Sequence, residues 1–255
     1  MNKMKFNPLI AIKDCTEWIN DWFNNNGPES PAVIGISGGK DSTVAAALCV
    51  KALGKERVIG VLLPNGEQAD IDDAKAVCEF LGIKHFELNI SLAYDAIIAQ
   101  MNIQNDITPS KQTRINLAPR IRMTSLYAVS QSFNGRVVNT CNLSEDYVGY
   151  STKYGDAAGD FSPLSNFTVT EVKAIGKELG LPEYLIEKAP SDGLCGKTDE
   201  DNLGFTYDSL DRYIRFSEGD SKTIDMIEKK HCQNMFKMQP MPSFSKAISN
   251  YYSEM

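Results

Sequence analysis

A glycine-rich segment near residue 40 carries the residue types best suited to bind a phosphate group. Its members follow one another without a gap and are Gly35, Ile36, Ser37, Gly38, Gly39, Lys40, Asp41 and Ser42. Glycines let backbone N–H groups approach phosphate oxygens closely, and serine hydroxyls add further donors. A carboxylate beside bare phosphates would repel them, so Asp41 is best explained by a magnesium ion that joins it to a pyrophosphate group. The segment therefore predicts a site for a nucleotide polyphosphate.

The spacing of this segment departs from a Walker A loop. That loop has the pattern GxxxxGK followed by Ser or Thr, whereas here the glycine spacing is one residue short and Asp41 follows Lys40. A plain glycine turn between a strand and a helix is the simpler alternative, which Asp41 and Ser42 disfavour. The string from Ser37 to Ser42 instead resembles the pyrophosphate loop of the superfamily that cleaves ATP to AMP and pyrophosphate. That superfamily includes the NAD synthetases, the amidating domain of GMP synthetase and several tRNA-modifying enzymes.

Two later segments favour one branch of that superfamily. Residues 139–145 read NTCNLSE, and residues 149–160 contain the string TKYGD followed by a second aspartate. Both are similar to the signature of the NAD synthetase family. The resemblance extends from about residue 14 to residue 242, with the signature segments in the family's order.

The resemblance implies a role for individual residues. ATP would contact the loop from Gly35 to Ser42 and two hydroxyl residues further on, Thr140 and Ser191. Magnesium would bind Asp41 and Glu145, and catalysis would depend on Lys40 and Asp41, which stabilise charge on the leaving pyrophosphate. The substrate deamido-NAD would bind four charged side chains, namely Arg120, Lys153, Asp160 and Lys237.

Two positions depart from the family pattern. Many members have a lysine that touches ATP at the position of Val169, and neighbouring Lys173 is the candidate to replace its charge. The usual His-Lys pair near the carboxyl end is represented by Phe236 and Lys237. Lys237 still offers an ammonium group, whereas Phe236 can only stack.

The elements expected around these residues alternate between strands and helices. Buried or β-branched runs predict strands at 32–36, 58–63, 84–88 and 136–140. Helical spacing predicts helices at 8–25, 42–53, 71–81, 121–133, 168–179, 207–216 and 221–236. This alternation favours an α/β fold with a three-layer, doubly wound parallel sheet, which the resemblance narrows to the adenine nucleotide alpha hydrolase-like fold. Ligands of such sheets bind where the strands end.

Composition gives the broad class. Lysine and arginine number 26 against 33 aspartates and glutamates, so the net charge is −7, and 42% of residues are hydrophobic. The acidic balance disfavours nucleic acid and anionic membranes as partners, and six cysteines without a CxxC pair disfavour a zinc site. No stretch reaches the roughly 20 apolar residues of a membrane span. We expect a cytoplasmic protein with a single domain over 1–255 that becomes helical from about 168.

The resemblance implies an ammonia-dependent NAD synthetase, a ligase that amidates deamido-NAD through an adenylated intermediate and releases AMP and pyrophosphate. Glutamine-using relatives carry an additional amidohydrolase domain. We expect no room for one here, so the nitrogen donor would be free ammonia unless a separate glutaminase delivers it. The family is typically homodimeric, and the first helix and the carboxyl-terminal helices are candidates for the contact.

Two alternatives remain open. The first is another pyrophosphate-loop enzyme, such as a GMP synthetase-like amidating domain or a tRNA-thiolating domain. The negative charge and the scattered cysteines disfavour the tRNA version. The second is a sensor that binds ATP or NAD without turnover, which Val169 and Phe236 make worth testing.

Overall fold

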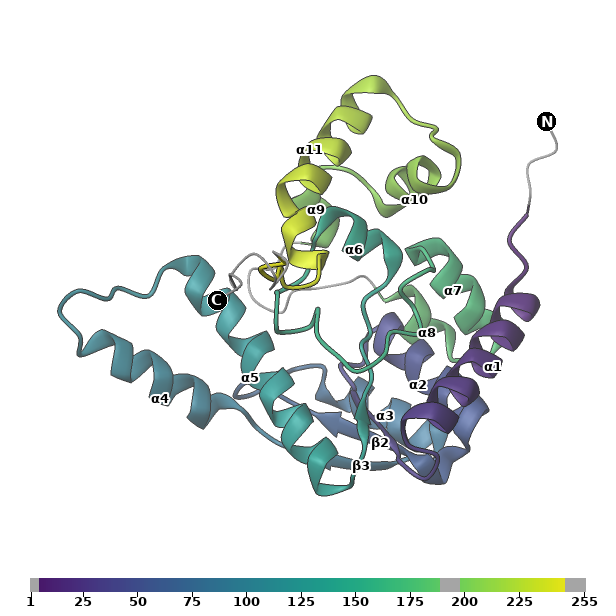
Figure 1. Cartoon of the computed structure of the whole chain (residues 1–255), viewed down its shortest axis with the longest axis horizontal. Coiled ribbons are helices and arrows are strands. Elements are labelled where there is room, and N and C mark those ends of the chain that lie inside the picture. Colours follow the sequence, from purple (N-terminus) through teal and green to yellow (C-terminus); the bar gives the residue numbers. More distant parts are fainter. Residues whose placement is uncertain (1–4, 189–197, 246–255) are drawn as a thin grey trace, which may run out of the picture.

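A parallel sheet lies at the centre of the molecule (Figure 1). Within residues 5–188 and 198–245, which the computed structural model describes, the sheet has four strands: β1 (Ala32–Gly35), β2 (Val58–Leu62), β3 (Lys84–Glu87) and β4 (Arg136–Val137). Their order across the sheet is β3-β2-β1-β4. In the register, Ala32 lies opposite Val58 on one side and Arg136 on the other. The parallel pairing confirms the predicted sheet and brings the carboxyl ends of these strands to one edge.

Helices connect the strands and continue beyond the sheet. In the described part of the chain they are α1 (Pro8–Asn26), α2 (Lys40–Leu53), α3 (Ile71–Leu81), α4 (Ser91–Asn102), α5 (Lys111–Ser132), α6 (Leu143–Val148), α7 (Val169–Glu178), α8 (Glu183–Glu187), α9 (Asp199–Leu203), α10 (Tyr207–Phe216) and α11 (Ser221–Met238). No described helix is both long enough and apolar enough to cross a bilayer.

The two faces of the sheet are covered by different helices. Successive side chains of a strand point to opposite faces, and β1 follows this rule. Ala32 and Ile34 pack in one core with α1, α2, α3 and α7, whereas Val33 packs in a second core with α5. A third hydrophobic cluster joins α6, α10 and α11, which lie above the sheet in Figure 1. The arrangement confirms the three predicted layers.

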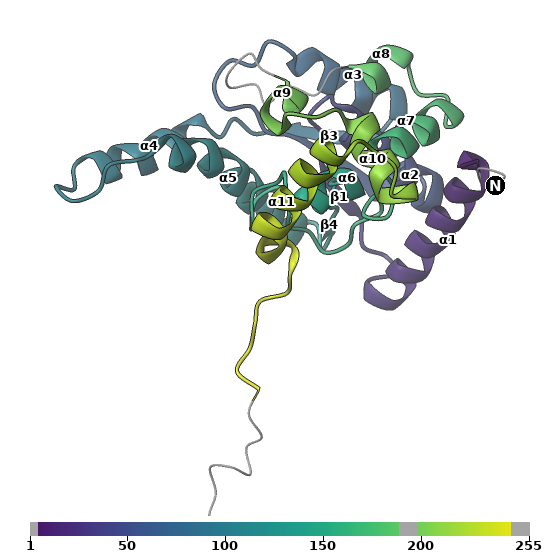
Figure 2. The same ribbon diagram turned by 90° about the horizontal axis from the view of Figure 1, so that it is seen from above.

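Several elements differ from the prediction. The last strand ends at Val137. Beyond it, the Val138 N–H still donates to the Val33 carbonyl of β1 at 2.9 Å, Val138 forms an isolated bridge with Phe161, and the Asn139 N–H donates to the Phe161 carbonyl at 2.9 Å. The helix predicted at 121–133 is the second half of α5, whose first turns are polar and contain Pro119. Helix α4 was not predicted, and it extends with the start of α5 as an arm away from the body (Figures 1 and 2).

Four of the five cysteines in the described part of the chain behave as small core residues. Those at positions 15, 49, 78 and 141 are buried, and Cys232 is exposed. Burial raises the pKa of Cys15 to about 12 and that of Cys78 to about 11. These thiols are therefore protonated and unreactive in the folded chain at neutral pH.

Candidate active site

The predicted phosphate loop turns between the end of β1 and the start of α2. Ser37 and Ser42 face each other across this turn, because their Oγ atoms lie 3.1 Å apart and the Ser37 N–H donates to Ser42 Oγ at 3.3 Å. Ser42 also donates to the Gly39 carbonyl at 3.1 Å. Gly39 is the N-cap of α2, and no side chain of the described residues caps this helix. The first N–H groups of α2 are therefore left to a ligand or to solvent.

Gly38 is required at its position for two reasons. Its φ of +78° lies in the left-handed region, where residues with a Cβ are strained. A Cβ would also lie 2.9 Å from the Ala74 nitrogen and 2.9 Å from the Asp73 Cβ. Helix α3 therefore packs directly against the loop and fixes one side of it.

Asn142 joins the two predicted magnesium ligands. Its Nδ2 donates to Asp41 Oδ1 at 2.9 Å, and its Oδ1 accepts the Glu145 N–H at 3.1 Å. The Asn142 N–H donates in turn to Glu145 Oε2 at 3.4 Å, which completes the capping box that begins α6. Asp41 and Glu145 come from distant parts of the sequence, and the fold brings them to the same edge of the sheet.

The electrostatics of this pair suit a divalent cation. Burial and the neighbouring charge of Asp41 raise the pKa of Glu145 well above its usual value. Magnesium is commonly held by one or two carboxylates, with the other ligands supplied by water and nucleotide phosphates. The described residues contain no group of three or more Asp, Glu, His or Cys side chains arranged to hold a metal. The assignment of Asp41 and Glu145 as magnesium ligands stays a prediction.

The Lys40 side chain turns inward from the start of α2. It is only 3% exposed, and its Nζ donates to Asp41 Oδ2 at 2.8 Å. Burial lowers the pKa of Lys40, but the carboxylates of Asp41, Glu145 and Asp199 more than offset this, so the pKa is raised and the ammonium is charged. The predicted contact between Lys40 and phosphate stays a prediction.

Sequence reasoning missed Asn142, Asp199 and Tyr207 as parts of the site. Asp199 is the first residue of α9 and is 7% exposed, and the Tyr207 hydroxyl lies 3.5 Å from its Oδ2. The Tyr207 ring centroid lies 5.9 Å from Lys40 Nζ. Acidic residues at a helix start are favoured by the helix dipole in any case, so the sequence carried no signal specific to Asp199.

The three cations predicted to bind the substrate all take part in contacts of residues 149–155, which we call the signature loop. Arg120 on α5 donates through Nε to the Lys153 carbonyl at 3.2 Å. Lys153, within the loop, donates to the Phe236 carbonyl at 3.0 Å, and Lys237 donates to the Gly149 carbonyl at 2.9 Å. Helices α5 and α11 thus both contact the signature loop.

Asp160 lies apart from these cations. Its Oδ2 accepts the Val137 N–H at 2.7 Å, and its Oδ1 accepts the Tyr127 hydroxyl at 3.1 Å. The carboxylate therefore ties the chain after the signature loop to β4 and α5. Its contact with the substrate stays a prediction.

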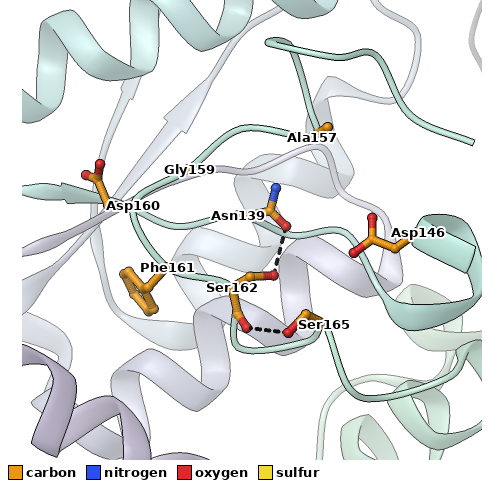
Figure 3. Close-up of a pocket in the computed structure, with 8 residues that line it drawn as sticks. All are labelled: Asn139, Asp146, Ala157, Gly159, Asp160, Phe161, Ser162 and Ser165. Carbon is orange, nitrogen blue, oxygen red and sulfur yellow. Dashed lines mark hydrogen bonds between the residues drawn. The ribbon is translucent and has the colours of Figure 1, made fainter. Parts of the chain in front are cut away.

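A pocket of about 280 Å³ opens beside the end of β4. Figure 3 shows its lining, which consists of Asn139, Asp146, Ala157, Gly159, Asp160, Phe161, Ser162 and Ser165. Asn139 accepts from the Ser162 hydroxyl at 3.0 Å and donates to the Asp156 carbonyl at 2.8 Å. Burial and the charge of Asp156 raise the pKa of Asp146 to about 6. The pocket is thus a polar hollow next to the signature loop.

Four positions discussed in the sequence analysis remain, namely Thr140, Ser191, Val169 and Lys173. Thr140 is half-buried at the end of β4, and Ser191 lies outside the described residues. Val169 is buried, and its N–H donates to Ser144 Oγ at 3.0 Å. The Lys173 ammonium is engaged by Glu187 at 2.8 Å. ATP contacts by Thr140, Ser191 and Lys173 stay predictions.

Comparison with known proteins decides the family. A sequence profile described as NAD synthase matches residues 11–246. The chain belongs to the NAD synthase family. This family consists of ligases that form NAD, so the membership confirms the resemblance seen in the pyrophosphate loop and the signature loop.

Individual members of the NAD synthase family match most of the chain. An NH(3)-dependent NAD(+) synthetase of Finegoldia magna is 36% identical over 94% of this chain and 97% of its own length. The structure of NMN synthetase from Francisella tularensis superposes with a TM-score of 0.86 at 35% identity, covering 95% of this chain and all (100%) of that one. An NH3-dependent NAD synthetase from Campylobacter jejuni gives a TM-score of 0.75 at 30% identity, covering 95% of this chain and 100% of that one. These structures confirm the adenine nucleotide alpha hydrolase-like fold.

Proposed function

We propose that this protein amidates deamido-NAD with ammonia in a reaction that converts ATP to AMP and pyrophosphate and requires magnesium. The observation that carries the proposal is the bridge made by Asn142. It holds Asp41, at the uncapped start of α2, together with Glu145 at the start of α6. Open backbone N–H groups and two carboxylates at one edge of the sheet are what a magnesium–polyphosphate complex needs.

The chemistry must activate a carboxylate, which is a poor electrophile. The nicotinate carboxylate attacks the α-phosphate of ATP, the bond to pyrophosphate breaks, and an adenylate forms. Ammonia then attacks the carboxyl carbon, and AMP leaves with one of the former carboxylate oxygens. The N–H groups of α2 and the hydroxyls of Ser37 and Ser42 stabilise the charge on pyrophosphate. Magnesium bound to Asp41 and Glu145 would neutralise part of that charge.

The cations of the signature loop suit the dinucleotide substrate. Arg120 and Lys237 donate to backbone carbonyls of residues 149–155, and Lys153 belongs to this loop. Arginine and lysine pair with phosphate oxygens, and deamido-NAD carries a pyrophosphate. Free ammonia as the nitrogen donor is supported by the relatives of Thermococcus kodakarensis and Finegoldia magna, which are NH(3)-dependent NAD(+) synthetases.

A product assay tests this function. The protein is incubated with deamido-NAD, ATP, magnesium and ammonium, and we expect NAD, AMP and pyrophosphate in equal amounts. Asp41→Asn should abolish turnover, whereas Asp208→Asn, which removes an exposed carboxylate on α10, should retain it. Release of ADP, or ATP binding without any turnover, would contradict the proposal.

A second candidate is amidation of the mononucleotide. It is favoured by the Francisella tularensis NMN synthetase, whose TM-score of 0.86 exceeds the 0.75 of the Campylobacter jejuni enzyme. Measuring kcat/KM for deamido-NAD and for nicotinate mononucleotide on the same preparation separates the two. A higher value for the mononucleotide would make NMN the product and would overturn the first choice.

We also propose that the protein is a homodimer whose contact covers α4. Helix α1 buries Ile19 and Phe23 in the core of the chain itself, and its apolar residue Leu9 is 62% exposed, so its part in a contact stays a prediction. Helix α4 and the turn after it expose their large apolar side chains further: Leu92 is 83% exposed and Ile103 is 67% exposed. A second copy of the chain would bury them.

The mass of the protein in solution tests the dimer. Light scattering should give twice the chain mass, and Ile103→Asp should give the chain mass. Phe80→Asp changes an exposed apolar residue on α3 in the same way and should leave the dimer intact. A monomeric native protein, or an Ile103→Asp dimer, would contradict the proposed contact.

A further inference from the structure

The predicted magnesium site already holds a positive charge that belongs to the protein. The Lys40 ammonium is 2.8 Å from Asp41 Oδ2, and it is stabilised electrostatically by Glu145 and Asp199. The Lys40 side chain is 2% exposed, so this position is in the interior of the site and not at its mouth. A charged group is buried in this way only when opposite charges surround it.

Both oxygens of Asp41 are occupied by N–H donors. Lys40 donates to Oδ2 at 2.8 Å, and Asn142 donates to Oδ1 at 2.9 Å. Each carboxylate oxygen keeps a second lone pair that could bind a metal, but an ammonium 2.8 Å from Oδ2 would repel a divalent cation bound to the same carboxylate. The Asn142 contact is uncharged and connects Asp41 to α6, whereas the Lys40 side chain is long and rotatable. Lys40 is therefore the donor whose departure favours metal binding.

We propose that the Lys40 ammonium is the resident cation of the Asp41–Glu145 site in the nucleotide-free protein, and that a divalent cation binds there only after the ammonium has left Asp41. The inference rests on the magnesium ligands assigned under the proposed function. The phosphates of ATP offer the ammonium another anion next to the same loop. Nucleotide and metal then bind with positive coupling, because the nucleotide removes the competitor of the metal.

Manganese affinity of the full chain without nucleotide tests the inference, with free Mn²⁺ followed by electron paramagnetic resonance. Lys40→Met keeps the length of the side chain and removes its charge, and it should bind Mn²⁺ at least about tenfold more tightly than the native chain. Lys177→Met is the matched control, since it removes an exposed lysine of α7 whose partner is Glu187, at 2.6 Å, on α8. It should leave the affinity within twofold of native. Equal affinities of Lys40→Met and native chain would overturn the inference.

The native chain provides a second measurement that needs no Lys40 variant. Without nucleotide, millimolar magnesium should raise the melting temperature of the native chain no more than that of Asp41→Asn. With a non-hydrolysable ATP analogue, magnesium should raise it further in the native chain only. A native chain that magnesium alone stabilises beyond Asp41→Asn would overturn the inference. Neither measurement depends on turnover. The inference about Lys40 can therefore be wrong while the product assay still shows NAD formation, and the two failures can be told apart.

Discussion

Replacing Gly38 by alanine tests the geometry of the phosphate loop. The added Cβ would meet the backbone of Ala74 and the side chain of Asp73, each at 2.9 Å. The alanine would also have to adopt the φ of +78° that Gly38 has, in the left-handed region that a residue with a Cβ rarely occupies. Either the loop or the start of α3 must therefore move, and both flank the proposed nucleotide site.

The expected loss of unfolding free energy is the sum of the backbone strain and the steric overlap. A left-handed conformation costs a residue with a Cβ about 1–2 kcal/mol. Forcing an extra carbon into a packed contact typically costs about 1–3 kcal/mol. Gly180 separates the terms, because its φ is +72° and nothing lies within 4 Å of an added Cβ. We expect Gly180→Ala to lose about 1–2 kcal/mol and Gly38→Ala about 2–5 kcal/mol of unfolding free energy.

Urea denaturation measures both losses, provided that the slope of the transition stays constant. Steady-state kinetics then measure the functional part. Gly38→Ala should raise the KM for ATP at least about tenfold, which corresponds to about 1.4 kcal/mol, and Gly180→Ala should leave it unchanged. If the two variants lose equal stability and bind ATP equally well, the close packing of α3 against the loop is refuted.

Three further predictions concern other parts of the site and the core. Asn142→Ala should lower kcat at least about tenfold and destabilise the protein by about 1–2 kcal/mol through the lost cap of α6; a normal kcat would remove Asn142 from the site. Lys237→Met should raise the KM for deamido-NAD and leave the KM for ATP unchanged, and an effect on ATP alone would contradict the substrate assignment. In a Cys195→Ser background, a thiol reagent at pH 8 should modify Cys232 rapidly and the buried cysteines only after unfolding. Rapid modification of several thiols would refute their burial.

The fold was predictable where local pattern and tertiary packing agree. Helix α3 occupies the predicted 71–81, because its apolar residues recur at helical spacing and Gly82 ends it in a left-handed conformation. The last strand ends at Val137 rather than at the predicted residue 140, and the bridge between Val138 and Phe161, which are distant in sequence, follows from no local pattern. Helix α4 was missed because its exposed apolar residues do not form one buried face.

The site was predictable at the level of motifs. The motifs at residues 35–42 and 139–145 were sufficient to predict Asp41 and Glu145 as site residues. In the structure both lie at one edge of the sheet, where Asn142 hydrogen-bonds to each of them. The inward direction of the Lys40 side chain could not be predicted, because it depends on carboxylates from α6 and α9. The spacing of residues along the chain does not indicate whether a flexible lysine contacts a carboxylate of the protein or a phosphate of the nucleotide.

The central claim is that the substrate carboxylate attacks the α-phosphate of ATP at this site. Deamido-NAD labelled with ¹⁸O in both carboxylate oxygens tests it directly, with mass spectrometry of the products after turnover with ammonium. The account predicts that one ¹⁸O atom appears in AMP and one remains in the carboxamide of NAD, with none in pyrophosphate. AMP without the label, or label in inorganic phosphate accompanied by ADP, would contradict it.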